Sequence, residues 1–195
     1  MADSQIIWSV GHSNHSIERF VEILNANGIT SVADLRSQPY SRYTGHFNQI
    51  PLQRALESAG IGYTFLGMEL GGRPTDKSMY DADGYVLYGE MAKSEIFNLG
   101  LQQLIEISEH SPTAMMCSEE DPTDCHRRLL VTRVLEGLPI PVEHIRGDAS
   151  IVTEQELADQ IDAKNPPTLF GEEDKPWRSV LSVLRSTPPR NSSNH

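Results

Sequence analysis

The sequence has little cysteine, no long apolar run and no leader-like N-terminus. Its 195 residues include two cysteines, and in a cytosolic chain so few thiols are more often free, catalytic or metal-binding than joined in a structural disulfide. No apolar run approaches the roughly 20 residues that a membrane helix needs. The N-terminal MADSQ lacks the basic and apolar regions of a secretory signal. We therefore expect a cytoplasmic protein without membrane contact.

Basic residues are also scarce: 16 Lys and Arg stand against 27 Asp and Glu, a net charge of -11. General binding of duplex nucleic acid needs a broad basic face, so this function is not expected. A local basic pocket is compatible with the charge, because Arg36, Arg42, Arg54 and Arg73 fall in a stretch with few acids. Such a pocket could bind a phosphate or a carboxylate. For each arginine alone, a solvated position on a helix face explains the residue equally well.

The common phosphate-binding loops are missing. No GxGxxG follows the first apolar segment, and no GxxxxGK[ST] occurs. A Cys-x5-Arg phosphatase loop is absent as well, because Thr123 stands six positions after Cys117 and Val131 six positions after Cys125. The usual nucleotide-binding and phosphatase motifs therefore do not explain this chain.

What is present is an alternation of short apolar segments with amphipathic ones. Apolar residues at helical spacing separate the short segments, and Ser16 is a plausible N-cap for the first helix. This order predicts βαβ units, so we expect an α/β fold of three layers, Rossmann-like, with a mostly parallel five-stranded sheet and helices on both faces. The five expected strands are IIWSV (6–10), SVADL (31–35), GYTFLGMEL (62–70), TAMMC (113–117) and PVEHI (141–145).

The character of the sequence changes near residue 150. We expect residues 1–150 to form the α/β domain that carries the site, and residues 151–195 to form a C-terminal extension. Thr153 and Glu156 match a capping box, which predicts a short helix, and a second short helix is expected near 177–184. The final STPPRNSSNH is typical of a disordered tail.

Polar residues with catalytic potential follow every predicted strand. In open α/β sheets ligands bind beyond the carboxyl ends of the strands, so we expect these residues to share one crevice. Loops are polar in any protein, and the convergence of five strand ends is therefore the stronger signal. The residues are His12, Ser13, Asp34, Arg36, Glu69, Gly71, Gly72, Cys117, Glu119, His144 and Arg146.

The stretch MCSEEDPTDCHRRLL (116–130) holds both cysteines. Asp124 is a good helix N-cap, which would place Cys125, His126 and Arg127 in the first turn. A thiol at that end of a helix has a lowered pKa and favours the thiolate. Arg127 would then hold an anion. Packing explains the same pattern, since Cys125 could be a helix residue that points inward.

Cys117 ends the predicted fourth strand and faces the same crevice, unless it is simply a small buried side chain. The stretch therefore offers Cys125 or Cys117 as a nucleophile and His126 or Glu119 as an acid or base. A metal site is an alternative use of the two cysteines and His126, but Cys-x7-Cys-His is not a usual structural zinc spacing and no fourth ligand is evident. We predict no cofactor, with zinc left open.

Several blocks of the sequence resemble the domain of unknown function 488 family. They are SVGHSNHSIERF, ADLRSQPYSRYTGHFN, GIGYTFLGMELGGRP, the 85–97 segment, and MCSEEDPTDCHRRLL with VEHI downstream, in order over roughly three quarters of the chain. The resemblance implies an α/β fold and a pocket, but no reaction. The pocket positions it implies are Gly11, His12, Ser13, Asp34, Arg36, Arg42, Phe47, Gly71, Gly72, Cys117, Glu119, Cys125, His126 and Arg127.

The first functional hypothesis is an enzyme acting on a small anionic substrate, such as a nucleotide or a modified base. Arginines would hold the anion, a cysteine would attack, and Phe47 or Tyr43 would stack on a base. A module that binds a ligand or a metal without turnover is the second hypothesis. A third is a nucleic-acid repair or defence component that recognises an exposed base. Leu169-Phe170 is similar to the end of clamp-binding peptides and is a weak candidate contact for a protein partner.

Overall fold

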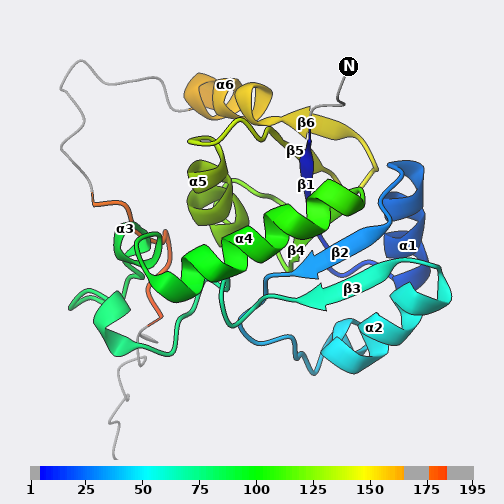
Figure 1. The fold of residues 1–195 in the computed structure, drawn as a ribbon, viewed down its shortest axis with the longest axis horizontal. Coiled ribbons are helices and arrows are strands. Elements are labelled where there is room, and N and C mark those ends of the chain that lie inside the picture. The colour runs from blue at the N-terminus through cyan, green and yellow to red at the C-terminus, as the bar shows by residue number, and fades with distance from the viewer. Residues whose placement is uncertain (1–4, 165–175, 184–195) are drawn as a thin grey trace, which may run out of the picture.

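A computed structural model describes residues 5–164 and 176–183 of the chain. One six-stranded sheet in the order β3-β2-β4-β1-β5-β6 crosses the molecule (Figure 1). The first five strands run parallel, and β6 pairs antiparallel with β5. The strands are β1 (Ile7–Gly11), β2 (Ser31–Asp34), β3 (Gly62–Phe65), β4 (Thr113–Cys117), β5 (Val142–Ile145) and β6 (Ile151–Thr153).

The α/β fold with a mostly parallel sheet is confirmed, but the sheet has six strands instead of five. The strand that the sequence did not reveal, β6, has only three residues and follows a turn in which Asp148 accepts bonds from Ser150. So short a segment shows no alternation of apolar and polar residues. The order also differs from the common dinucleotide-binding order 3-2-1-4-5-6, because β4 lies between β2 and β1.

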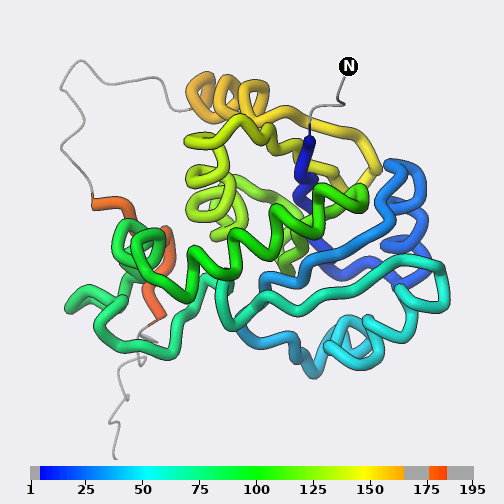
Figure 2. Tube along the Cα trace, viewed as in Figure 1, coloured from blue at the N-terminus to red at the C-terminus, as the bar shows by residue number. Residues whose placement is uncertain are grey.

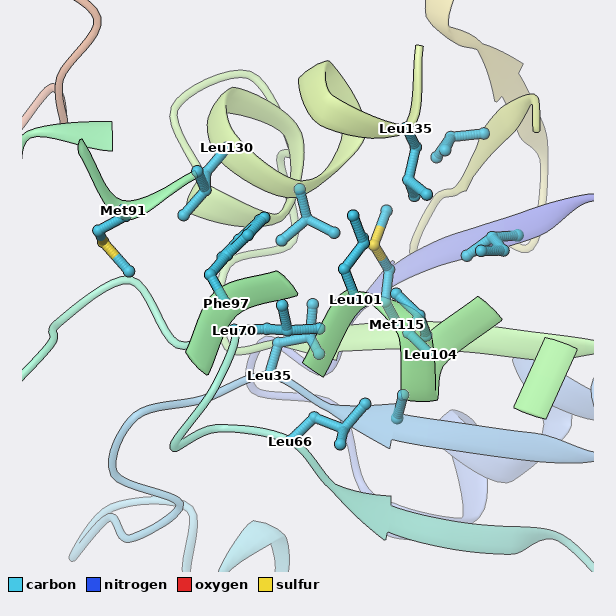
Figure 3. Close-up of a cluster of buried hydrophobic side chains, with 14 of the residues drawn as sticks. Leu35, Leu66, Leu70, Met91, Phe97, Leu101, Leu104, Met115, Leu130 and Leu135 are labelled. Carbon is cyan, nitrogen blue, oxygen red and sulfur yellow. The ribbon is translucent and has the colours of Figure 1, made fainter. Parts of the chain in front are cut away.

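Helices cover both faces of the sheet. On one face α1 (Ile17–Ala26) and α2 (Gln49–Ser58) pack on Val32, Ala114 and Met116. On the other face α4 (Glu95–His110) and α5 (Arg133–Leu135) pack on Ala33 and Met115 (Figure 3). Neighbouring residues of β4 thus enter opposite cores, as the two-residue period of a strand requires. The three predicted layers are present.

The remaining elements lie at the edges of this sandwich. They are η1 (Gly45–Phe47), η2 (Lys77–Met79), α3 (Tyr88–Met91), the π-helical η3 (Arg127–Thr132) that leads into α5, and α6 (Glu154–Lys164). Two predicted helix starts are confirmed. Ser16 Oγ accepts a bond from Arg19 N, and Thr153 and Glu156 exchange the two reciprocal bonds of a capping box.

Residues 176–183, which we call the closing segment, do not form the expected short helix over 177–183. They run beside α3 and the residues before it (Figure 2). Their backbone bonds are made across this contact: Gly89 N donates to Trp177 O, Ser179 N to Val86 O, and Val183 N to Gly84 O. Because these partners come from elsewhere in the chain, local sequence could not predict the conformation.

Leu169-Phe170 and the tail STPPRNSSNH lie outside the described residues. Within the described ranges, none of the helices combines the length and the apolar character that crossing a bilayer demands.

Candidate functional site

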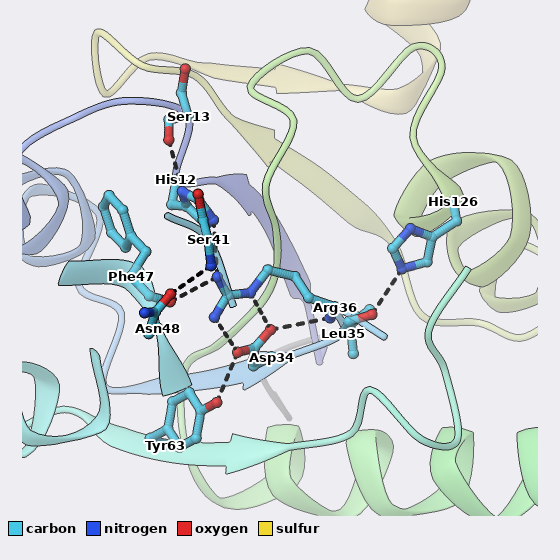
Figure 4. Close-up of polar contacts among 10 residues, drawn as sticks. All are labelled: His12, Ser13, Asp34, Leu35, Arg36, Ser41, Phe47, Asn48, Tyr63 and His126. Carbon is cyan, nitrogen blue, oxygen red and sulfur yellow. Dashed lines mark hydrogen bonds and ion pairs between the residues drawn. The ribbon is translucent and has the colours of Figure 1, made fainter. Parts of the chain in front are cut away.

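The carboxyl ends of β2, β4 and β1 lie side by side and place two groups of polar side chains. Gly11 at the end of β1 pairs with Cys117 at the end of β4, and Asp34 of β2 pairs with Met116. Cys117 belongs to one group, with Cys125 and His126. Asp34 belongs to the other, with Arg36, Tyr63 and His12 (Figure 4). These three strand ends therefore meet at one edge of the sheet but carry two distinct arrangements.

Cys117, Cys125 and His126 form what we call the Cys–Cys–His group. The Sγ atoms of Cys117 and Cys125 each lie 3.8 Å from Nδ1 of His126, and the three atoms all lie within 4.8 Å of one another. Both cysteines are free and buried. These three side chains lie close enough together to hold a metal ion.

The ring of His126 is held in one orientation by its second nitrogen. Nε2 lies 3.1 Å from the carbonyl oxygen of Leu35, at the end of β2 (Figure 4). A carbonyl oxygen only accepts hydrogen bonds, so the proton must be on Nε2. In neutral His126 the lone pair of Nδ1 therefore faces the two sulfur atoms.

Gly72 packs against Cγ, Cβ and Nδ1 of His126. A Cβ atom at position 72 would lie 2.6 Å from Cγ of His126, well inside van der Waals contact. We expect Gly72→Ala to displace His126 and to lower the free energy of unfolding by about 1–3 kcal/mol, as overpacking does. Urea denaturation measures the change.

Gly89→Ala is the matched control for that substitution. Gly89 lies in α3, and a Cβ there would meet nothing closer than 3.7 Å. The control should leave stability unchanged or raise it by about 0.5 kcal/mol, because alanine restricts the unfolded chain. Equal losses in both variants would contradict the proposed contact with His126.

The two cysteines titrate in opposite directions. A hydrogen bond from the Cys125 thiol holds the pKa of Cys117 well below its usual range, and the nearby His126 and Arg127 add to this effect against the cost of burial. The same bond, together with burial, raises the pKa of Cys125. Burial alone would lower the pKa of His126, but the charge of Cys117, the hydrogen bond with Cys117 and the hydrogen bond with Leu35 O together outweigh it, so the pKa rises. These directions favour a thiolate at Cys117 and a protonated ring at His126.

The predicted activation of Cys125 by a helix N-terminus is wrong. The helical stretch η3 begins after His126 with no side-chain cap, so the Asp124 carboxylate does not accept a capping bond from its first turn. Asp121 accepts the local bond instead, from Thr123 N. Helical bonding starts at the carbonyl of Cys125, which accepts from the backbone N–H groups of Arg128 and Leu129. The activated thiol is therefore Cys117, at the end of β4.

A pocket of about 300 Å³ opens beside the Cys–Cys–His group. All three members line it, together with Glu119 and Tyr88. Arg73 lines it as an exposed cation, held through its backbone N–H by Ser37 Oγ. Residues 179–183 of the closing segment complete one side. Elements far apart in the sequence thus enclose the group.

The second group is a buried ion-pair network. Arg36 Nε and Nη2 donate to the two oxygens of Asp34 at 2.8 and 2.6 Å, and Tyr63 Oη donates to Asp34 Oδ2 at 2.8 Å (Figure 4). The Tyr63 pKa is raised by burial and by the charge of Asp34. Arg36 lines the pocket, but its charge is already balanced by a fully buried carboxylate.

His12 completes this network as a neutral acceptor. Its Nδ1 lies 2.8 Å from Ser13 O and its Nε2 lies 3.1 Å from Arg36 Nη1, so Nδ1 carries the proton and Nε2 accepts. Burial and the Arg36 charge lower the His12 pKa to about 4. Phe47 is buried and stacks on His12 with ring centroids 4.1 Å apart. Both residues support Arg36 instead of facing the pocket.

Gly11 allows the two groups to meet. A Cβ at position 11 would lie 1.7 Å from the backbone oxygen of Glu119. Only glycine fits here. Because Gly11 has no side chain, the segment that follows β4 can lie directly against the end of β1. His12 N and Ser13 N then donate to Cys117 O and Ser118 O, which fixes the path of residues 117–119.

The predicted site residues thus divide into two sets. Those that line the pocket are Arg36, Gly72, Cys117, Glu119, Cys125 and His126. Arg42 is exposed elsewhere, Arg127 is buried with Nη2 donating to Glu120 O, and Gly71 packs on Ser37. Ser13 has a φ of 47° and lies outside the pocket, with His12, Asp34 and Phe47.

Sequence reasoning named Arg73 as a candidate for a local basic pocket but missed Tyr88 and the closing segment as pocket residues. Arg73 had a signal, because it belongs to the arginine-rich stretch with few acids and directly follows Gly71-Gly72. For Tyr88 the sequence showed only a position at helical spacing, which does not indicate a pocket residue. The closing segment had no signal, because its place depends on contacts with Val86 and Gly89.

The sequence comparisons agree with these motifs. Residues 16–134 match the family described as Domain of unknown function DUF488. The chain belongs to this family. The DUF488 match contains the whole Cys–Cys–His group, Asp34, Arg36 and Arg73, whereas His12 precedes it and the closing segment follows it. Neither the curated proteins nor the solved structures gave a match.

Two kinds of chemistry are open to the Cys–Cys–His group. A thiolate beside an imidazolium is a nucleophile with a proton donor within reach. Two sulfur atoms and one imidazole nitrogen around a common point are metal ligands. Both uses need the same three side chains at the floor of the same pocket.

Proposed function

We propose that this DUF488 protein is an enzyme that acts on a small anionic substrate, with the Cys–Cys–His group as its reaction centre. The observation that carries the proposal is the position of the group. Three chemically reactive side chains lie at the floor of a pocket whose wall carries the cation Arg73. A group with a purely structural role has no need of such an opening.

Arg73 is the residue proposed to bind the anion. The other pocket arginine, Arg36, is occupied by Asp34, His12 and the Phe47 carbonyl oxygen, whereas within the described residues the hydrogen bond of Arg73 is made by its backbone N–H, to Ser37 Oγ. A guanidinium presents several donors to a phosphate or carboxylate. The substrate is therefore expected to lie between Arg73 and the Cys–Cys–His group.

Glu119 and Tyr88 are proposed to move protons near the substrate. Both line the pocket. Burial raises the pKa of the Tyr88 hydroxyl, and the charges of Cys125, Cys117 and Glu119 raise it further, so Tyr88 stays protonated as a donor. The volume of about 300 Å³ is at the lower end for ligand pockets, which favours a small substrate. Tyr40, also in the wall, replaces Phe47 and Tyr43 as the candidate for stacking on a base.

Removing the Arg73 side chain should weaken anion binding. With pyrophosphate as the probe, we expect Arg73→Ala to raise the dissociation constant by roughly 10- to 150-fold, since one charge-assisted contact contributes about 1.5–3 kcal/mol. Isothermal titration calorimetry measures the constant. Arg42→Ala is the matched control, because Arg42 is equally exposed but lies outside the pocket. Identical constants in the two variants would remove Arg73 from the proposal.

The enzyme hypothesis itself is tested by turnover. The wild-type protein should hydrolyse or transfer a group from at least one member of a panel of nucleotides, phosphate esters and small carboxylate esters. Cys117→Ser should lower kcat for that substrate about 100-fold or more while the protein remains folded. Turnover that survives in Cys117→Ser would contradict the assigned reaction centre.

A metal-binding module without turnover is the second candidate. The closeness of the three ligand atoms, all within 4.8 Å of one another, favours it, and sulfur with imidazole suits zinc better than the oxygen-preferring ions. It differs from the enzyme in one respect: the pocket would bind ligands, but no member of the substrate panel would be converted.

A further inference from the structure

We infer that Cys117, Cys125 and His126 bind one zinc ion and leave its fourth coordination position open to the pocket. One part of this inference rests on the proposed function, namely that an anionic substrate or water binds at the open position. Zinc binding itself depends on the three ligands alone.

The ligand atoms already have the spacing of a zinc site. Tetrahedral zinc with Zn–S bonds of about 2.3 Å and Zn–N bonds of about 2.0–2.1 Å separates neighbouring ligand atoms by about 3.6–3.8 Å. The two distances from sulfur to Nδ1 are both 3.8 Å. Little movement of either cysteine is therefore needed to complete three bonds.

His126 is prepared for this role by its surroundings. A histidine that binds a metal usually donates its other ring N–H to a carbonyl or carboxylate, which fixes the ring and the tautomer. Here Nε2 is 3.1 Å from Leu35 O, and the Cβ-free surface of Gly72 lies against the ring. Nδ1 consequently has no freedom to turn away from the sulfur atoms.

The charge balance also favours zinc. Two buried thiolates side by side would repel each other and lose their hydration, whereas one divalent cation neutralises both. Soft sulfur donors select zinc over magnesium and calcium, which prefer oxygen.

The open position follows from the number of ligands. Among the residues that the structure describes, the group has three members, and all three line the pocket. Structural zinc sites have four protein ligands, and catalytic sites have three with one exchangeable position. The arrangement thus belongs to the second type.

The test is metal analysis of the full chain, purified in reducing buffer without chelator. We expect about one zinc ion per chain, a content below about a tenth of this in Cys117→Ser, Cys125→Ser and His126→Gln, and no loss in the control His110→Gln. His110 is an exposed residue at the end of α4. Circular dichroism verifies that each variant is folded, and zinc titration of the chelator-treated wild-type protein gives the stoichiometry independently of any variant.

Cobalt substitution tests the geometry. Co²⁺ in the wild-type protein should give thiolate charge-transfer absorption and intense tetrahedral d–d bands, and azide should shift the d–d bands by entering the fourth position. Bands that azide leaves unchanged would overturn the open position. The site would be overturned if protein with two titratable thiols contained no zinc, took up no zinc and gave no cobalt bands. A Cys117–Cys125 disulfide formed under these conditions would also overturn it. Bound zinc without turnover would instead contradict the proposed function and leave the zinc site standing.

Discussion

Asp34→Asn is expected to lower the free energy of unfolding by about 3–5 kcal/mol, the cost of leaving one member of a buried ion pair without its partner. Asp34 is fully buried and accepts four hydrogen bonds, two from the Arg36 side chain, one from Arg36 N and one from Tyr63 Oη. Asparagine fills the same space but removes the negative charge. The Arg36 guanidinium would then be buried as an unbalanced cation.

Urea denaturation of the variant beside Tyr63→Phe tests this expectation. Tyr63→Phe deletes one donor to the Asp34 carboxylate but leaves the ion pair, and should cost about 1.5–3 kcal/mol. The double variant Asp34→Asn with Arg36→Met should recover part of the loss, because it removes the stranded charge. An Asp34→Asn protein no less stable than Tyr63→Phe would show that the network carries little of the stability.

Acid should destabilise the protein through His12. The His12 pKa falls from 6.5 to about 4 in the folded protein, chiefly because the ring is buried and secondly because Arg36 is adjacent. Between these two values the unfolded chain binds a proton that the folded protein does not. Stability contributed by neutral His12 is therefore complete above about pH 6.5 and is lost as the pH falls toward 4. At about 1.36 kcal/mol per pH unit the loss amounts to about 3 kcal/mol.

The measurement is the free energy of unfolding at pH 7 and pH 4 for the wild-type protein and for His12→Asn. Asparagine does not titrate, so the variant should lose about 3 kcal/mol less than the wild type over this interval. The carboxyl groups titrate in both proteins and cancel in the comparison. The same acid sensitivity in both proteins would mean that His12 does not hold the low pKa assigned to it.

The sequence indicated where the candidate site lies better than it indicated which residues line the pocket. Strand ends in a parallel sheet meet at one edge, so the positions of Cys117, Asp34 and His12 near one another followed from the strand assignment. The pairing of Asp34 with Arg36 had a signal too, because residues two apart in an extended segment point to the same side. Arg36 could therefore have been recognised as a partner of Asp34 before being assigned to an anion.

Other features depend on tertiary contacts that no local pattern encodes. Asp124 looked like a helix cap, but the helical segment begins after His126 and passes through a π-helical stretch. The pairing of Nε2 of His126 with Leu35 O joins residues 91 positions apart. The pocket wall formed by residues 179–183 requires the contact with Val86.

During synthesis, the segment 179–183 emerges from the ribosome well after Cys117, Cys125 and His126. Domains fold as their chain emerges, so the sheet and the reaction centre can assemble while the side of the pocket that these residues form is still missing. Docking of the closing segment, in which the Trp177 indole donates to Leu129 O at 2.6 Å, then adds residues 179–183 to the lining of the pocket. We expect a chain truncated before residue 176 to keep the reactive sulfur atoms but to leave them open to bulkier reagents than the complete protein does.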